Sequence, residues 1–212
     1  MIDHLTTTTR DGLPVELSPF VPTDVDRVYE LCQDADIQHW TTVPSPYLMS
    51  NAETYVNDYT AEAWREIAAS TFSVSEAGPE LVWAVRLSGA LAGLWGTIGL
   101  KRYGQGELEI GWWLGAGARG RGVMRAVVAE TLRTAFGPLE AREVWWYAMT
   151  GNRPSALIAQ RTGFEYRGLI CEYRGRTLPA EEALWSAVIR QGEPLVLRAE
   201  WPLEFSTPNP GS

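Results

Sequence analysis

The feature that most constrains the fold is a succession of four segments between residues 107 and 149. Glu107–Leu114 is rich in apolar and β-forming residues and is predicted to be a strand. A glycine-rich turn follows, and the apolar residues after it recur at helical spacing from about Gly120 to Phe136. Val144–Met149 is short and almost wholly apolar, as expected for a strand buried on both faces. A strand, a helix and a buried strand in this order require a sheet with a helix packed against it.

The other segments extend this pattern in both directions. Strands are predicted at 13–20, as an edge strand, and at 71–75, 81–87, 91–100, 164–173 and 183–189, with hairpin turns at Gly78-Pro79 and Ser88-Gly89. Helices are predicted from about Asp24 to Asp34 with Thr23 as N-cap, and from about Ala52 to Ala69. The second is capped near Ser50 or Asn51, with Glu53 in a capping box. Asn152 is predicted to cap a short helix that ends near Thr162, before Gly163.

Strands and helices are therefore mixed without strict alternation, which is typical of an α+β domain. A length of 212 residues fits one domain, with its core at about 13–190. The first dozen residues are expected to form a loose lead-in, and the proline-rich tail from Pro202 is expected to be loose as well.

The composition limits the partners and the location. A net charge of −8 argues against nonspecific binding to nucleic acid or to anionic membranes. The two cysteines, Cys32 and Cys171, have no metal-ligand spacing, so neither a disulfide framework nor a metal site is expected. No signal peptide or membrane-spanning run is visible, and the expected location is the cytoplasm.

The turn before the central helix is an exception to this acidic composition. Arg119, Arg121 and Arg125 crowd the positive end of the helix dipole, where a cation is disfavoured by roughly 0.3–1 kcal/mol. A turn that opens a helix also presents unpaired backbone N–H groups. Two interpretations fit this turn by itself: an ordinary strand-to-helix turn with solvated arginines, or a binding site for a small anionic ligand. In a protein with a net charge of −8, the local arginine cluster is consistent with the ligand.

A dinucleotide site is one alternative for this ligand. Gly115, Gly117 and Gly120 match the G-x-G-x-x-G fingerprint, but that site also needs an acid at the end of the next strand. Glu140 and Glu143 precede the strand Val144–Met149, and Thr150-Gly151-Asn152 occupies the place of the acid. We therefore reject the dinucleotide interpretation.

A second interpretation of the same turn depends on a different glycine, Gly122. The pattern Arg119-x-x-Gly122-x-Met124 resembles the (Gln/Arg)-x-x-Gly-x-(Gly/Ala) loop of the Gcn5-related N-acetyltransferase (GNAT) superfamily. Asn152-Arg153-Pro154-Ser155, followed by Gly163-Phe164, resembles the family's next helix and strand. Glu109-Ile110-Gly111-Trp112-Trp113-Leu114 and the loop from Trp40 to Tyr47 are similar to the branch that acetylates ribosomal-protein N-termini (the RimJ and RimL type). The resemblance covers about residues 13–190.

This resemblance implies a mixed, mostly antiparallel sheet flanked by helices, and an enzyme that moves the acetyl group of acetyl-CoA to a primary amine. The amine is a protein N-terminus or a small molecule, it attacks directly within a ternary complex, and homodimers are common among relatives. The implied cofactor-binding residues are Trp113, Leu114, Arg119, Gly120, Arg121, Gly122, Val123, Met124, Asn152 and Ser155.

The resemblance also implies catalytic roles. Glu109 or Glu107, on one face of a strand, is expected to take the amine proton, and Ser155 to supply a proton to the departing thiolate. The backbone N–H of Trp113 or of Leu114 is expected to polarise the thioester carbonyl. Trp40 and Tyr47 are expected to line the acceptor pocket.

Two positions depart from the family pattern. Met124 stands where the family prefers Gly or Ala, so its side chain must either point away from the ligand or narrow the cleft. Ala159 stands where many relatives carry a tyrosine that acts as general acid. These departures keep open a second hypothesis, a catalytically inactive sensor or scaffold protein that binds CoA.

Overall fold

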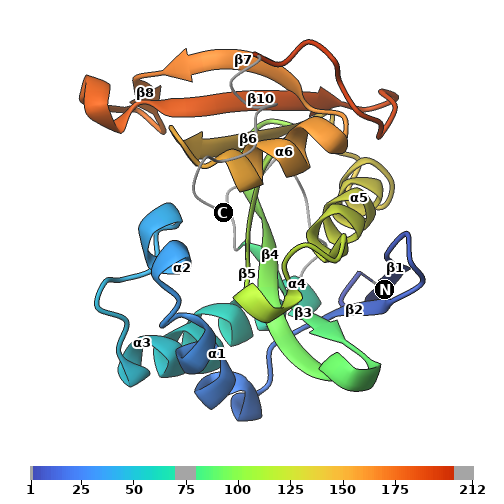
Figure 1. Cartoon of the computed structure of the whole chain (residues 1–212), viewed down its shortest axis with the longest axis vertical. Helices are drawn as coiled ribbons and strands as arrows, with labels where there is room; N and C mark the ends of the chain where they lie inside the picture. Colours follow the sequence, from blue (N-terminus) through green and yellow to red (C-terminus); the bar gives the residue numbers. More distant parts are fainter. Residues whose placement is uncertain (1, 70–79, 203–212) are drawn as a thin grey trace.

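An eight-stranded sheet forms the centre of the structure, in the order β1-β2-β3-β4-β5-β6-β10-β7 (Figure 1). The computed structural model describes residues 2–69 and 80–202. All neighbouring strands are antiparallel except β5 and β6, which are parallel. The strands are β1 (Leu5–Thr8), β2 (Pro14–Ser18), β3 (Leu81–Leu87), β4 (Gly93–Gly104), β5 (Glu107–Leu114), β6 (Glu143–Met149), β7 (Glu165–Ile170) and β10 (Leu184–Arg190). The predicted α+β class and the mostly antiparallel sheet are confirmed.

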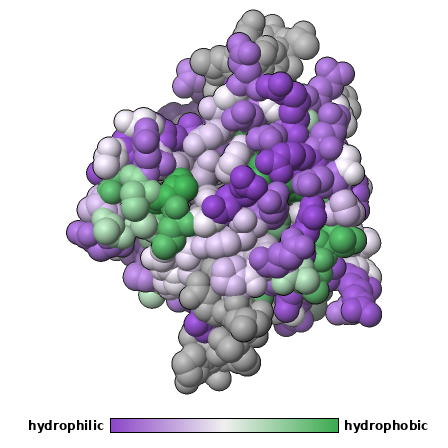
Figure 2. All heavy atoms as spheres, turned by 90° about the horizontal axis from the view of Figure 1, so that it is seen from above, coloured by the Kyte–Doolittle hydropathy of each residue, from purple (hydrophilic) through white to green (hydrophobic). Residues whose placement is uncertain are grey.

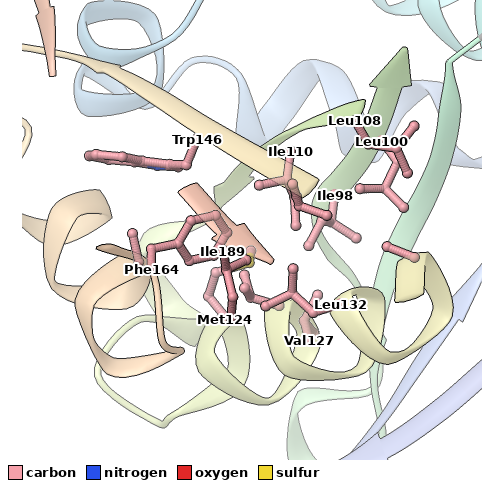
Figure 3. Close-up of a cluster of buried hydrophobic side chains, with 14 of the residues drawn as sticks. Ile98, Leu100, Leu108, Ile110, Met124, Val127, Leu132, Trp146, Phe164 and Ile189 are labelled. Atoms are coloured by element: carbon pink, nitrogen blue, oxygen red, sulfur yellow. The ribbon is translucent and has the colours of Figure 1, made fainter. Parts of the chain in front are cut away.

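One face of the sheet carries the larger core. Helix α5 (Val123–Phe136) makes the crossover that a parallel pair requires, from the end of β5 to the start of β6. It packs with α6 (Arg153–Arg161) against this face, where Ile98, Ile110 and Trp146 are each at most 1% exposed. Figure 3 shows side chains of α5 meeting those of the strands and Phe164, which follows α6, in this core.

The opposite face carries a smaller core under the N-terminal helices. These are α1 (Val25–Leu31), α2 (Ala35–Trp40), α3 (Met49–Glu53), a π-helical stretch (Thr54–Thr60) and α4 (Ala61–Ala69). Val28, Ala52 and Val56 from these helices pack against Val82 and Trp113 of the sheet. In Figure 1, α1–α3 and α5 lie on opposite sides of β4 and β5, so each face of the sheet has its own helical layer.

The central elements agree closely with the sequence-based predictions. β3, β5 and β6 match the predicted strands within one residue at each end. The side chain of Asn152 accepts a hydrogen bond from the Ser155 amide at the start of α6, which confirms the predicted cap. Helix α5 ends at Phe136 as predicted but begins at Val123, because Gly120 and Gly122 both have φ near +74° and cannot be helical.

Several predictions near the N-terminus are wrong. The lead-in contains β1, which pairs with β2, so β2 is an interior strand rather than an edge strand. Thr23 is not the cap of α1, because a short 3₁₀ turn at Pro22–Asp24 precedes the helix. The carboxylate of Asp24 instead accepts a hydrogen bond from the Val21 amide and pairs with Arg86.

The second predicted helix is longer and less regular than expected. It begins at Met49, and Asn51, rather than Glu53, reaches back to the Leu48 amide. Helix α2 was missed because its six residues are too few for a periodic pattern. The predicted strand 71–75 and the turn Gly78-Pro79 fall outside the described residues.

The segment predicted as one strand at 164–173 is divided. β7 ends at Ile170, and a small separate hairpin follows, made of β8 (Glu172–Tyr173) and β9 (Arg176–Thr177). Its two turn residues, Arg174 and Gly175, have φ values of 51° and 73°, as expected for a tight hairpin turn.

The face of the molecule seen from above in Figure 2 is mainly hydrophilic, with apolar side chains gathered in a few places. In the described ranges, no helix combines the length and the apolar character needed to cross a bilayer.

Candidate active site

The parallel strands β5 and β6 separate part of the way along their length. Their register runs from Glu107 opposite Glu143 to Ile110 opposite Trp146 and then stops, although both strands continue. Figure 1 shows β6, β10 and β7 crossing the top of the molecule while β4 and β5 run away below them. We call this divergence beyond Ile110 and Trp146 the fork.

The fork leaves backbone groups of β5 without a strand partner on one side. The Gly115 amide donates to Trp95 O on the β4 side, at 2.7 Å. Because successive residues of a strand point their amides to opposite sides, the Trp113 amide also faces β4, and the Leu114 amide faces the fork. Of the two amides predicted to polarise a carbonyl, only that of Leu114 therefore faces the fork.

The first turn of α5 lies close in sequence to the fork. Gly122 is its N-cap residue, and no described side chain caps the helix. The first bond of the helix runs from the Ala126 amide to Gly122 O, so the amides of Val123, Met124 and Arg125 have no partner within the helix. With the helix dipole, these amides form a site suited to an anionic group.

Met124 does not narrow this site. Its side chain is 5% exposed and packs in the larger core. Figure 3 shows it among Phe164, Ile189 and Val127, on the inner side of α5. Of the two possibilities that the sequence leaves open, the structure therefore selects the one in which Met124 points away from the ligand.

The arginines of the turn have different environments. The guanidinium of Arg119 contacts Asp34 at 2.9 Å and Asp36 at 2.8 Å, and its Nε donates to Leu114 O. Arg119 therefore ties α2 to the turn and is largely neutralised. Arg121 is exposed, and it borders a cavity of about 430 Å³ together with Gly120 and residues of the β1–β2 and β3–β4 connections.

Ser155 lies at the root of the fork, on the α6 side of the sheet. Its Oγ accepts a hydrogen bond from Trp146 Nε1 at 3.1 Å, and Trp146 belongs to the last β5–β6 pair. Because the hydroxyl accepts from the indole, its own proton is available for donation. Ala159, one turn later on α6, is fully buried in the larger core.

Glu109 lies on the opposite face of the sheet, and both of its carboxylate oxygens have partners. Oε1 accepts from the Tyr173 hydroxyl at 2.6 Å, and Oε2 accepts from Arg174 Nη2 at 2.6 Å and Nε at 3.0 Å. The negative charge of Glu109 contributes to raising the pKa of Tyr173 to about 12, after burial. Glu107 shares this face but lies two residues farther from the fork.

Aromatic rings surround this ion pair. Trp145 and Tyr147 of β6 stack with their centroids 6.0 Å apart, and Tyr103 of β4 lies 5.5 Å from Tyr147. The guanidinium of Arg174 sits 5.4 Å from the Tyr103 ring centroid. A cavity of about 450 Å³ adjoins this cluster and is lined by Tyr103, Glu172, Arg174 and Gly175.

The two predicted acceptor-pocket residues are separated by the fold. Trp40, at the end of α2, reaches the far end of β6, where a Cβ on Gly151 would lie 3.2 Å from its ring. Tyr47 is 5% exposed and packs in the smaller core near Cys32, and burial is the main cause of its raised pKa. Trp40 therefore lies beside the end of β6, and Tyr47 is buried in the smaller core.

The sequence did not indicate Arg174 or Tyr173, because they reach Glu109 across 64 residues or more through a hairpin of two-residue strands. The only local signal was Gly175, which marks the turn.

Known proteins share this fold. The sequence matches the family described as acetyltransferase (GNAT) domain over residues 15–165, and no curated protein matches it. Among solved structures, it is similar to Mycobacterium smegmatis RimJ in complex with CoA-disulfide, with a TM-score of 0.66 and 19% identity. That match covers 88% of this chain and 86% of the other.

Two further structures show the same likeness. The ribosomal L7/L12 α-N-protein acetyltransferase RimL, in complex with coenzyme A, has a TM-score of 0.63 and 16% identity over 83% of this chain and 93% of its own. The microcin C7 self-immunity acetyltransferase MccE, in complex with acetyl-CoA and AMP, has a TM-score of 0.64 and 14% identity over 83% and 92%. At these identities the likeness establishes a shared fold.

Proposed function

The chain belongs to the GNAT acetyltransferase family, and on this premise we propose that it moves the acetyl group of acetyl-CoA to a primary amine. The amine, a protein N-terminus or a small molecule, attacks directly within a ternary complex. The observation that carries the proposal is the fork at Ile110 and Trp146, which lies next in sequence to a helix whose first amides are unpaired. Acetyl-CoA-bound and CoA-bound structures of the same fold support it.

The cosubstrate is proposed to lie along the fork. Its pyrophosphate accepts hydrogen bonds from the turn at 120–124, chiefly through backbone amides, with Arg121 as the exposed cation. Arg119 positions the turn by its bonds to α2 and to Leu114 O. The pantetheine arm passes Asn152 and Ser155 at the start of α6.

The acetyl transfer is proposed to take place at the fork, with Ser155 on one face of the sheet and the acceptor amine on the other. The Leu114 amide polarises the thioester carbonyl, and the Trp113 amide, which points to β4, is set aside. Ser155 relays a proton to the departing thiolate, from its position beside Trp146.

The acceptor amine approaches from the face that carries Glu109, with Trp40 at the edge of its pocket. Glu109 is nearer the fork than Glu107, but both of its carboxylate oxygens are engaged by Tyr173 and Arg174. We therefore assign Glu109 a structural role. Its bonds to Tyr173 and Arg174 hold the β8–β9 hairpin against the aromatic rings of Tyr103, Trp145 and Tyr147.

The hypothesis of an inactive CoA-binding protein loses one of its two grounds, because Met124 is buried and leaves the turn unobstructed. The other ground is Ala159, which stands in place of a tyrosine. It excludes only a mechanism in which that tyrosine acts as general acid. Ser155 offers a different proton source at the same end of the fork.

The first test is binding. A ligand that binds the native state at 100 times its Kd raises stability by about 2.7 kcal/mol, which for a chain of this length is a Tm increase of roughly 5–11 °C. Acetyl-CoA is expected to produce this shift, and NAD none. Acetyl transfer to a panel of short peptides with free N-termini, diamines and aminoglycosides then tests the activity by release of CoA thiol.

A matched pair of variants separates cosubstrate binding from general strain. Gly122→Ala and Gly192→Ala each put a side chain at positive φ, at +74° and +88°, without a close contact to a described atom. Both are expected to lower Tm similarly, and only Gly122→Ala is expected to lose the shift with acetyl-CoA. Equal shifts in the two variants would place the anion elsewhere.

We also propose that residues 1–212 form a single acetyltransferase domain, since the sheet that carries the site runs from β1 to β10. Homodimer formation, which the family resemblance implies, is tested by light scattering on the same preparation.

A further inference from the structure

A carboxylate from outside the predicted motifs lies over strand β4, one strand away from the fork. Glu80 immediately precedes β3, and strand alternation puts it on the same face as Val82 and Ala84, the face of the smaller core. Its side chain turns across the neighbouring strand β4. A Cβ at Gly99 would overlap Glu80 Oε1, so the carboxylate occupies the space that only a glycine leaves there.

Gly99 belongs to a pair of glycines on the adjacent strands β4 and β5, next to the fork. It is directly opposite Gly111 of β5, and Gly111 is the first residue after the last β5–β6 pair. Gly111 is exposed, and within the described part of the chain nothing lies within 4 Å of a Cβ built on it. The Glu80 carboxylate therefore borders an open space at the point where β5 leaves β6.

Glu80 is held by a tyrosine and has no ion-pair partner in the described part of the chain. Tyr59 donates its hydroxyl to Glu80 Oε2 at 2.7 Å. Tyr59 comes from the π-helical stretch and stacks on Tyr55, whose hydroxyl lies 3.3 Å from Thr97 Oγ1 on β4. Glu109, in contrast, has both oxygens engaged by Arg174 and Tyr173.

The charges around Glu80 act in both directions, and burial dominates. Burial raises the pKa of Glu80, and the negative charge of Glu109 raises it further. The Tyr59 hydrogen bond and the positive charges of Lys101 and Arg174 oppose this rise without cancelling it. Glu80 is therefore a stronger base than an exposed glutamate.

We propose that Glu80 is the group that takes the proton from the acceptor ammonium, a role that rests on the proposed acetyltransferase function. The ammonium gives one proton to the Glu80 carboxylate, directly or through one water, and becomes a neutral amine. Its lone pair forms the C–N bond at the thioester carbonyl carbon. The C–S bond then breaks with its electron pair on sulfur. The second nitrogen proton reaches that sulfur through Ser155, and the proton on Glu80 returns to solvent.

The kinetic test compares Glu80→Gln with the control Glu62→Gln, an exposed residue of α4. With an alkylamine acceptor, Glu80→Gln is expected to lower kcat/KM about 100-fold and to replace the acidic limb set by Glu80 with one set by the pKa of the amine itself. With an acceptor whose amine is already neutral at the assay pH, the loss should shrink to a few-fold. Equal losses with both acceptors, or an acidic limb at the wild-type position in Glu80→Gln, would overturn the proposal.

The pH profile of Tyr59→Phe distinguishes a catalytic role of Glu80 from a purely structural one. It removes the hydroxyl that stabilises the carboxylate, so the pKa of Glu80 should rise further. The acidic limb of kcat/KM should move upward by the same amount while the maximal rate is largely kept.

A measurement without any acceptor keeps the proposal testable. The side-chain carboxyl carbon of Glu80, assigned in the NMR spectrum by comparison with Glu80→Gln, should titrate above an ordinary glutamate and higher still in Tyr59→Phe. A midpoint at or below the ordinary value would overturn the role of Glu80 even if acetyl transfer is found. Failure of the wild-type protein to bind acetyl-CoA would instead overturn the proposed function.

Discussion

Filling the space above Gly111 should make the protein more stable and less active. Gly111 is not at positive φ, and no described atom lies within 4 Å of a Cβ at this position. Alanine there removes backbone freedom from the unfolded chain without creating a clash, which contributes about 0.4–1 kcal/mol. For a chain of this length, Gly111→Ala should raise Tm by about 1–4 °C.

The effect on activity follows from the position of the same space. This space lies between the Glu80 carboxylate and Gly111, the first residue of β5 after its last pair with β6. We expect the acceptor amine to meet the thioester there. Gly111→Val puts a branched side chain there, which a strand tolerates. We expect kcat/KM for the acceptor to fall at least about tenfold, since displacing a reactant by about 1 Å is enough for a loss of this size.

Thermal unfolding, acetyl-CoA titration and CoA-thiol release on the same variants provide the test. Gly99→Ala is the matched comparison, because its Cβ would displace the Glu80 carboxylate and should lower both stability and activity. Wild-type turnover in Gly111→Val would refute the location of the acceptor. A lower Tm in Gly111→Ala would refute the open space itself.

Three further outcomes are expected from single substitutions or labelling. Met124→Ala should lower stability by about 2–5 kcal/mol in denaturant unfolding without tightening acetyl-CoA binding, because Met124 fills the core; tighter binding would contradict its orientation. Since the folded-state pKa of Glu80 is raised, the stability that it contributes is present at low pH and lost as the pH rises through that pKa. Glu80→Gln should therefore match the wild-type Tm in acid and exceed it above neutral pH; a lower Tm at pH 8 would contradict this sign. Maleimide at neutral pH should label exposed Cys171 and spare Cys32, whose pKa burial raises to about 12, and mass spectrometry of the native protein detects the difference.

The sequence was most reliable where short-range rules decide the structure. Short runs rich in apolar and β-forming residues predicted β5 and β6, and helical periodicity predicted α5. Asn152 was identified as a cap because its side chain bonds to an amide only three residues away. The wrong N-terminal predictions have the same origin, since Thr23 and Glu53 fit capping rules that Asp24 and Asn51 fulfil instead.

The acidic residues near the N-terminus make contacts that these short-range rules do not predict. As a sequence pattern, Asp34 and Asp36 suit either a solvated helix or the attraction of a cationic substrate. In the fold they are the partners of Arg119, 83 to 85 residues later in the chain, and they hold α2 against the turn. No periodicity contains this pairing, because it depends on how the start of α2 meets the turn before α5.

The sequence by itself therefore determined the order of the elements, the glycine turn that leaves helix amides unpaired, and the residue types available for acetyl transfer. The tertiary structure alone decided that β5 and β6 separate after Ile110, that Arg174 engages Glu109, and that Glu80 lies over Gly99. Hydrogen bonds within a turn, a helix or a strand depend on neighbouring residues and can be read from them. The direction of a strand beyond its last pair and the partner of a carboxylate depend on the packing of the whole sheet.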